Sequence, residues 1–132
     1  MRQCAGGFLL SSGRILLGKR ASDRELSPNQ WDAIGGHSLP GEEPAHTLKR
    51  ELQEEIGITP SEFDGLGVLL EPNPEIHGQR EYHVFVVTKW IGEGPTILGD
   101  EHSELGWFGL EEASKLDLAH PGYLELFQIV LG

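Results

Sequence analysis

Hydrophobic and polar residues alternate along the chain in a way that predicts several strands around one strongly amphipathic helix. Two apolar-rich runs, 7–10 and 14–19, flank Ser11-Ser12-Gly13 and predict a β-hairpin. The polar segment 20–30 predicts a loop, and Trp31–Ile34 predicts a short strand that stops at the following Gly pair. Further strands are expected at Leu66–Leu70, at Tyr82–Trp90 and, as a shorter element, at Trp107-Phe108.

The clearest helix begins at Pro44 and ends before Gly57. Its apolar residues recur at spacings of three and four and form one stripe: Ala45, Leu48, Leu52 and Ile56. Proline suits the first turn of a helix, and Gly57 suits a left-handed residue that ends it, with Ile58 supplying an apolar contact. Leu110–Leu116 and Tyr123–Leu131 predict two further helices. The order β-β-β-α-β-β-(β)-α-α predicts a mixed α/β fold, a sheet with helices on its faces.

Length and composition place limits on the class of protein. The chain of 132 residues has no repeat, linker or low-complexity tract, so a single domain over residues 1–132 is expected. Cys4 is the only cysteine, which excludes an internal disulfide framework. No apolar run approaches the roughly 20 residues of a membrane-spanning helix, and the N-terminal run is too short for a signal peptide. We therefore expect a cytoplasmic protein with no membrane partner.

The formal net charge of −11 narrows the choice of ligand. An acidic surface repels polyanions, so a polymeric nucleic acid is not an expected partner. A small phosphorylated molecule can still bind when divalent cations bridge its charge to the protein carboxylates.

Three carboxylates are concentrated on the central helix. At about 100° per residue, Glu51, Glu54 and Glu55 occupy a sector of about 100° beside the apolar stripe. Like charges so close, near the helix C-terminus, are locally unfavourable. Such a cluster is either a solvated acidic face or a site for a hard cation such as Mg²⁺. Taken alone, the cluster favours the solvated face.

The spacing of the residues around this cluster instead favours the cation site. Gly36 is followed after five residues by Glu42, and after seven more by Arg50-Glu51-Leu52-Gln53-Glu54-Glu55-Ile56-Gly57-Ile58. All nine defined positions of the Nudix box are matched without a gap, so the chain closely resembles the Nudix hydrolase family. The box covers 23 of the 132 residues.

The resemblance implies a fold and a set of roles. The fold is an α/β/α sandwich with a mixed β-sheet flanked by helices. Glu54 and Glu55 are expected to bind metal, with Glu51 as a further ligand or the base, and a carbonyl of Gly35 or Gly36 completing the shell. Arg50 is expected to orient Glu51, while Glu42 braces the loop. The implied reaction is NDP–X + H₂O → NMP + phospho-X, with Mg²⁺ as cofactor and Mn²⁺ as an alternative.

Other site residues are expected outside the box. Family members commonly add a loop carboxylate, and the candidates are Asp100, Glu101 and Glu104. Glu101 is favoured because its turn-like segment lets the side chain reach the metals. The identity of the general base stays open among Glu51, Glu101 and Glu104. Three basic residues near the expected cleft are candidates for substrate phosphate contacts: Lys19, Arg20 and Arg80.

Two histidines and the cysteine carry weaker signals. His37 follows the Gly pair and can approach substrate, although a lone loop histidine is more often structural, and no role is assigned to His83. Cys4 is interpreted as a small buried hydrophobe.

The substrate and two rival functions remain open at this level. A nucleoside triphosphate, in oxidised or normal form, is the leading substrate, as in MutT-like members. ADP-ribose, other nucleotide sugars and dinucleoside polyphosphates are alternatives. Residues 19–37 also resemble isopentenyl-diphosphate isomerases, but those enzymes depart from the strict box, which this chain keeps. A non-catalytic nucleotide-binding module is the rival of another class, and such proteins usually lose box carboxylates. The oligomeric state, monomer or homodimer, is not predicted.

Overall fold

A mixed seven-stranded sheet forms the centre of the molecule. The computed structural model describes all 132 residues. Its elements are β1 (Arg2–Ser11), β2 (Arg14–Arg20), β3 (Trp31–Asp32), β4 (Ile34–His37), α1 (Pro44–Ile56), β5 (Thr59–Leu70), α2 (Pro74–His77), β6 (Arg80–Ile91), β7 (His102–Phe108), α3 (Leu110–Ser114) and α4 (Tyr123–Leu131).

Strands β1 and β2 each pair with three other strands of the sheet. The main order is β3-β2-β1-β6-β5, with β4 also paired to β1 and β7 to β2. The β1–β6 pair is parallel, whereas every other pair is antiparallel. Near its end β1 pairs with β2 at Leu9–Ser11, while its first half pairs with β4 at Cys4–Gly7. The sheet is therefore mixed, as the sequence predicts.

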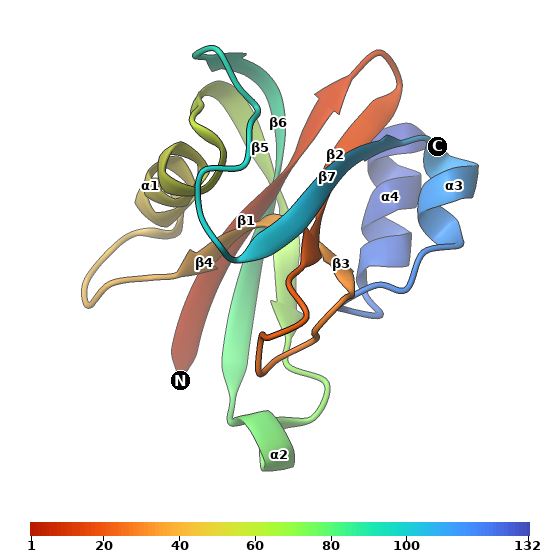
Figure 1. Ribbon diagram of the computed structural model, residues 1–132. Coiled ribbons are helices and arrows are strands. Elements are labelled where there is room, and N and C mark those ends of the chain that lie inside the picture. Colours follow the sequence, from red (N-terminus) through yellow and green to blue (C-terminus); the bar gives the residue numbers. More distant parts are fainter.

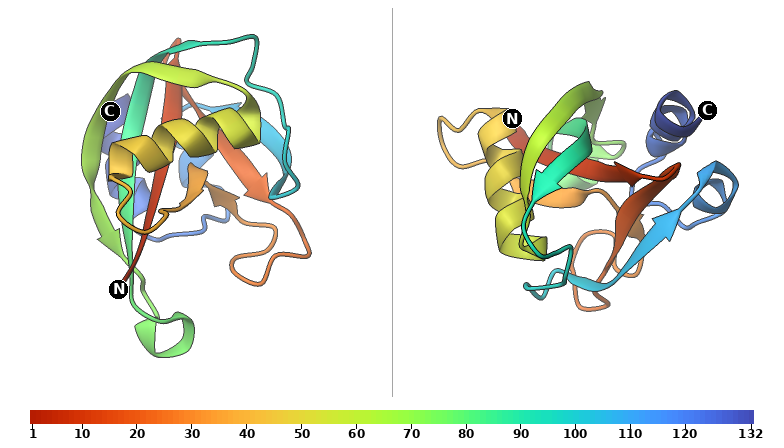
Figure 2. Two further views of the ribbon diagram at one scale, coloured as in Figure 1. Left: turned by 90° about the vertical axis from the view of Figure 1, so that its left-hand side faces the viewer. Right: turned by 90° about the horizontal axis from the view of Figure 1, so that it is seen from above.

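Helices cover both faces of this sheet (Figures 1 and 2). Helix α1 packs its apolar stripe on one face, in a cluster with Leu9, Ile34 and Val87. Helix α4 packs Tyr123, Leu126 and Phe127 on the other face around Phe8. Alternate side chains of β1 point to the two cores because successive residues in a strand face opposite sides. This arrangement is the expected α/β/α sandwich.

The structure corrects several expected boundaries. The strand expected at Trp31–Ile34 is divided at Ala33 into β3, which pairs with β2, and β4, which continues through both glycines and pairs with β1. A Cβ on Gly35 would collide with the backbone of Ala5 and Gly6, so only glycine allows the two strands to approach this closely. The strand expected at Leu66–Leu70 begins already at Thr59, because β6 supplies a partner along its whole length despite irregularities in register. The last strand begins at His102, five residues earlier than expected.

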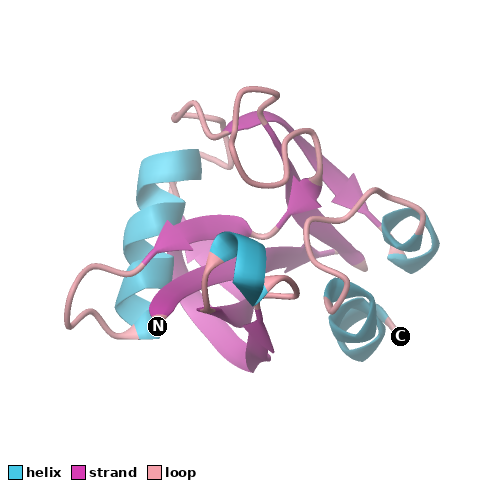
Figure 3. Ribbon diagram, turned by 90° about the horizontal axis from the view of Figure 1, so that it is seen from below, coloured by secondary structure: helices cyan, strands magenta, loops and turns pink.

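A short helix, α2, was not predicted. It lies on the loop that joins β5 and β6, away from the helices that cover the sheet (Figure 3). Its four residues are too few for a hydrophobic period to be recognised. No helix in the structure is long and apolar enough to cross a membrane.

The end of α1 positions the next loop. Gly57 adopts the expected left-handed conformation, with φ of 71°, and buried Ile58 packs with the α1 core. Two carbonyls of the last helical turn accept hydrogen bonds from the loop after β6: Ile56 O from Thr96 N at 3.1 Å and Glu55 O from Leu98 N at 2.9 Å. These bonds hold residues 99–102 beside the carboxylates of α1.

Candidate active site

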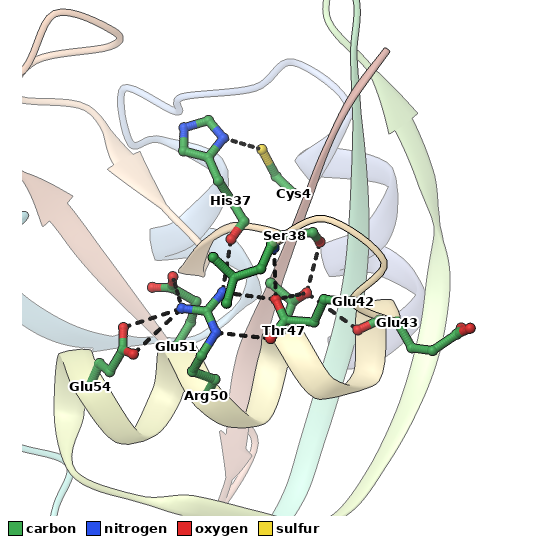
Figure 4. Close-up of polar contacts among 10 residues, drawn as sticks. Cys4, His37, Ser38, Glu42, Glu43, Thr47, Arg50, Glu51 and Glu54 are labelled. Atoms are coloured by element: carbon green, nitrogen blue, oxygen red, sulfur yellow. Dashed lines mark hydrogen bonds and ion pairs between the residues drawn. The ribbon is translucent and has the colours of Figure 1, made fainter.

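Arg50 connects the box loop to the acidic helix (Figure 4). Its guanidinium donates to both oxygens of Glu42 at 2.9 Å and to the carbonyl of His37 at 2.9 Å. It also donates to Glu51 Oε1 at 3.0 Å and approaches Glu54 at 3.4 Å. Arg50 therefore lies against Glu51, in the position from which it can orient that carboxylate.

Glu42 closes the loop that precedes α1. It accepts hydrogen bonds from the backbone N–H of Leu39 at 3.0 Å and from the Thr47 hydroxyl at 2.8 Å. The hydrogen bond from Arg50, the largest influence, lowers the pKa of Glu42 to about 2. A carboxylate that stays ionised and accepts from the loop and the helix holds the two segments together.

Glu51 is buried against Gly36. The residue is 8% exposed, and a Cβ on Gly36 would lie 2.5 Å from the Glu51 carboxyl carbon. Burial raises the pKa of Glu51, whereas the neighbouring Arg50 acts in the opposite direction. The first glycine of the box thus leaves the space that this carboxylate occupies.

A three-residue cluster at the end of α1 offers ligands for a metal ion. Glu55, Glu101 and His102 each provide one ligand atom, and these atoms lie within 4.8 Å of one another. Burial, followed by repulsion from Glu101 and Glu51, raises the pKa of Glu55 to about 7. Carboxylate oxygens with one imidazole nitrogen suit a divalent cation, whose charge would relieve this repulsion.

His102 is the member of this cluster that sequence reasoning missed. Its side chain is 3% exposed, and its Nδ1 lies 3.9 Å from Glu55 Oε2. Burial, with the positive charges of Arg20 and Arg24, lowers the pKa of His102 to about 4, so the imidazole is neutral and able to bind metal. Its ring lies where a side chain at position 18 would be, next to Gly18 in β2. The available signal was its position directly after Glu101, the favoured loop carboxylate.

The other expected ligands are distributed around this cluster. Glu101, the favoured loop carboxylate, lies beside Glu55, whereas the side chain of Glu104 is 57% exposed and pairs with Lys19 at 3.8 Å. The Glu54 side chain is 54% exposed and close to Arg50. The structure therefore groups Glu55 with Glu101, while Arg50 contacts both Glu51 and Glu54.

A cavity of about 850 Å³ opens on the α4 side of the sheet and reaches Glu101. Two of the three expected phosphate-binding residues, Arg20 and Arg80, line it, but Lys19 does not. Arg20 lies 3.5 Å from both Asp32 and Glu101. The partly buried Asp32 also accepts a hydrogen bond from the Tyr123 hydroxyl. The cavity thus meets the acidic cluster at Glu101.

His37 and Cys4 lie together on the wall of this cavity. The His37 Nδ1 is 3.3 Å from the Cys4 sulfur. Burial raises the pKa of the Cys4 thiol to about 11, so the sulfur is neutral and a poor nucleophile. Burial and the positive charges of Arg80 and Arg2 lower the pKa of His37.

Comparison with known proteins assigns the chain to a family. The family model described as NUDIX domain matches residues 1–128. The chain belongs to the Nudix family. A curated relative, nucleoside triphosphatase NudI of an Enterobacter species, is 27% identical over 119 residues that cover 84% of each protein.

Solved structures show the same fold. A MutT Nudix hydrolase from Burkholderia pseudomallei is 28% identical, with a TM-score of 0.73 and coverage of 84% of each chain. A Nudix hydrolase from Nitrosomonas europaea, at 16% identity, shares the fold with a TM-score of 0.80 over 96% of this chain and 86% of its own. The chain is therefore a Nudix hydrolase, an enzyme that acts on pyrophosphate bonds, as the box predicts.

Proposed function

We propose that this Nudix hydrolase is a Mg²⁺-dependent pyrophosphohydrolase of nucleoside triphosphates, releasing NMP and pyrophosphate. The observation that carries the proposal is the cluster of Glu55, Glu101 and His102, which lies where the carboxylates of α1 meet the large cavity. Curated relatives named nucleoside triphosphatase support the choice of substrate.

The protein groups at this junction have complementary tasks. Glu55 and Glu101 offer the oxygen ligands that Mg²⁺ prefers, with Mn²⁺ as an alternative because His102 adds a nitrogen. A bound divalent cation neutralises phosphate charge and lowers the pKa of a coordinated water. Glu54 and the carbonyl at Gly36 are proposed to complete the metal site.

Glu51 is proposed as the base that accepts the proton of the attacking water. Burial raises its pKa above that of an ordinary carboxylate, which brings its basicity closer to neutral pH. Arg50 holds one of its oxygens at 3.0 Å and thereby fixes the direction of the other. Glu101 is the alternative base, because it borders both the metal cluster and the cavity.

The nucleoside is proposed to bind in the cavity. A volume of about 850 Å³ falls within the range of small-molecule sites. Its wall combines aromatic surfaces, Tyr82 and Tyr123, with charged groups from β2, β6 and the loop 23–30. Arg20 lies at the entrance to the acidic cluster and is positioned to meet a phosphate.

A substrate panel tests the proposal. Nucleoside triphosphates, their oxidised forms, ADP-ribose, nucleotide sugars and dinucleoside polyphosphates are incubated with Mg²⁺, and products are identified by mass. We expect NMP and pyrophosphate from a triphosphate at the highest kcat/KM. Preferential turnover of ADP-ribose or a nucleotide sugar would contradict the proposed substrate, and no turnover of any diphosphate would indicate a binding module.

Glu54→Gln tests the metal assignment within that assay. The substitution removes a charge from an exposed side chain, so we expect turnover to be abolished while the melting temperature stays unchanged. Glu43→Gln is the matched control, since Glu43 is an exposed acidic residue of the same box whose side chain has no hydrogen-bond partner. Wild-type rates in Glu54→Gln would remove Glu54 from the metal site.

A further inference from the structure

Four of the six arginines of this acidic protein line one cavity. Arg20 and Arg24 are the pair near Glu101, at distances of 3.5 and 3.9 Å from its carboxylate. Arg2 and Arg80 are the other pair. They are register partners on the parallel strands β1 and β6, so their Cα atoms are about 4.8 Å apart.

The second pair has no compensating charge. Neither Arg2 nor Arg80 forms an ion pair or a side-chain hydrogen bond, although the chain carries 21 acidic residues. The Nε atom of Arg80 is buried without a hydrogen-bond partner. Adjacent like charges and an unmet buried donor are both unfavourable, and such an arrangement is typical of a binding site.

The cavity carboxylate whose backbone bonds to Arg80 has its side chain directed elsewhere. Glu71 follows β5, and its backbone N–H donates to the carbonyl of Arg80 at 3.0 Å. Its side chain accepts from the Tyr82 hydroxyl at 2.8 Å and from the N–H of Asn73 at 2.9 Å. The two guanidinium groups are thus left available for an anion from outside the protein.

The pair is separated from the acidic cluster along the strand. Gly36, which contacts Glu51, is the register partner of Ala5, three residues beyond Arg2 on β1. At about 3.3 Å per residue this is a separation of about 10 Å. An anion held by Arg2 and Arg80 is therefore a different group from a diphosphate bound at the carboxylates.

We propose that Arg2 and Arg80 form a subsite for a second phosphate, carried on the sugar of the substrate and distinct from the scissile diphosphate. Two planar guanidinium groups match the charge and the bidentate geometry of a phosphomonoester dianion. This inference rests on the proposed function in placing the nucleoside in the cavity. It deepens the proposed function by predicting a preference for substrates that carry an additional phosphate on the ribose.

Binding of hydrolysis-inert probes tests the subsite without requiring turnover. The affinities of AMP, adenosine 2′,5′-bisphosphate and adenosine 3′,5′-bisphosphate are measured by calorimetry on the full chain. We expect one of the bisphosphates to bind about 10-fold or more tightly than AMP. Equal affinities for all three probes would overturn the proposal.

Arg80→Gln and Arg2→Gln then test the residues. We expect each to raise the Kd of the preferred bisphosphate about 10-fold more than the Kd of AMP. Arg2 is exposed, so its variant remains informative if the partly buried Arg80 proves necessary for folding. Arg14→Gln is the matched control, because Arg14 is an unpaired arginine on the β1–β2 hairpin, outside the cavity. If the variants raise the Kd of all three probes equally, the arginines contact the 5′-phosphate or the base that the probes share, and the proposal is overturned.

Hydrolysis of NAD and NADP, which differ by one 2′-phosphate, separates this inference from the proposed function. If both dinucleotides are hydrolysed, we expect the ratio of their kcat/KM values to favour NADP and to fall toward one in Arg80→Gln. If no diphosphate is hydrolysed, but the protein prefers a bisphosphate over AMP and loses this preference in the arginine variants, the proposed function is wrong and the subsite is supported.

Discussion

Gly36→Ala is the substitution that most directly tests how the backbone of β4 positions the carboxylate of Glu51. A Cβ at this position would lie 2.5, 2.6 and 2.7 Å from the Glu51 carboxyl carbon and its two oxygens. Ordinary van der Waals contact begins at 3.4 Å, so the carboxylate must move by about 0.9 Å. The backbone of Gly36 is not left-handed, and alanine can adopt it.

The expected magnitude follows from these distances. The group that moves is the end of a flexible side chain, so we expect stability to change by no more than about 1 kcal/mol. A displacement of about 1 Å in a catalytic group can reduce the rate about 100-fold. We therefore expect kcat to fall about 100-fold in a protein that melts close to the wild-type temperature.

The assay combines initial rates at saturating substrate and Mg²⁺ with thermal unfolding. Gly65→Ala is the matched control, because Gly65 is also a strand glycine, at a position where the nearest heavy atom lies 4.0 Å from an added Cβ. We expect that variant to retain wild-type kcat. A Gly36→Ala enzyme with a kcat within about twofold of wild type would refute the idea that contact with Gly36 sets the position of Glu51.

Three further outcomes are expected. Because its folded pKa is raised to about 7 from 4.5, Glu55 contributes stability at low pH that is lost as pH rises through 7. In urea denaturation of the metal-free protein, Glu55→Gln should therefore gain stability relative to wild type as the pH rises from 4.5 to 7. If the difference between their free energies of unfolding does not change with pH, the pKa of Glu55 is not raised. His102→Gln should weaken Mn²⁺ binding about 10- to 100-fold in an electron paramagnetic resonance titration, with exposed His46→Gln as control; unchanged affinity would remove His102 from the cluster. Leu52→Ala should lower the free energy of unfolding by about 2–5 kcal/mol, because Leu52 is fully buried, whereas the exposed Leu39→Ala should have little effect.

The fold was predictable where the deciding interactions are local. The period of the apolar residues in α1, the proline at its start and the left-handed glycine after its end are properties of neighbouring residues, and the structure agrees with all three. The hairpin at Ser12-Gly13 is local in the same sense, with Ser11 paired to Arg14. By contrast, residues 59–65 are polar and contain Pro60, so only the pairing with β6 makes them part of a strand.

The candidate site divides in the same way. The sequence alone determined that Glu51, Glu54 and Glu55 share one side of a helix, since helical geometry follows from their spacing. Loop 94–98 bonds to the end of α1, and only this tertiary contact places Glu101 and His102 beside Glu55. The β1–β6 pairing likewise makes neighbours of Arg2 and Arg80, which are far apart in the sequence. Contacts of this kind depend on how separate elements pack against one another. The local sequence of one element does not specify which other element it contacts.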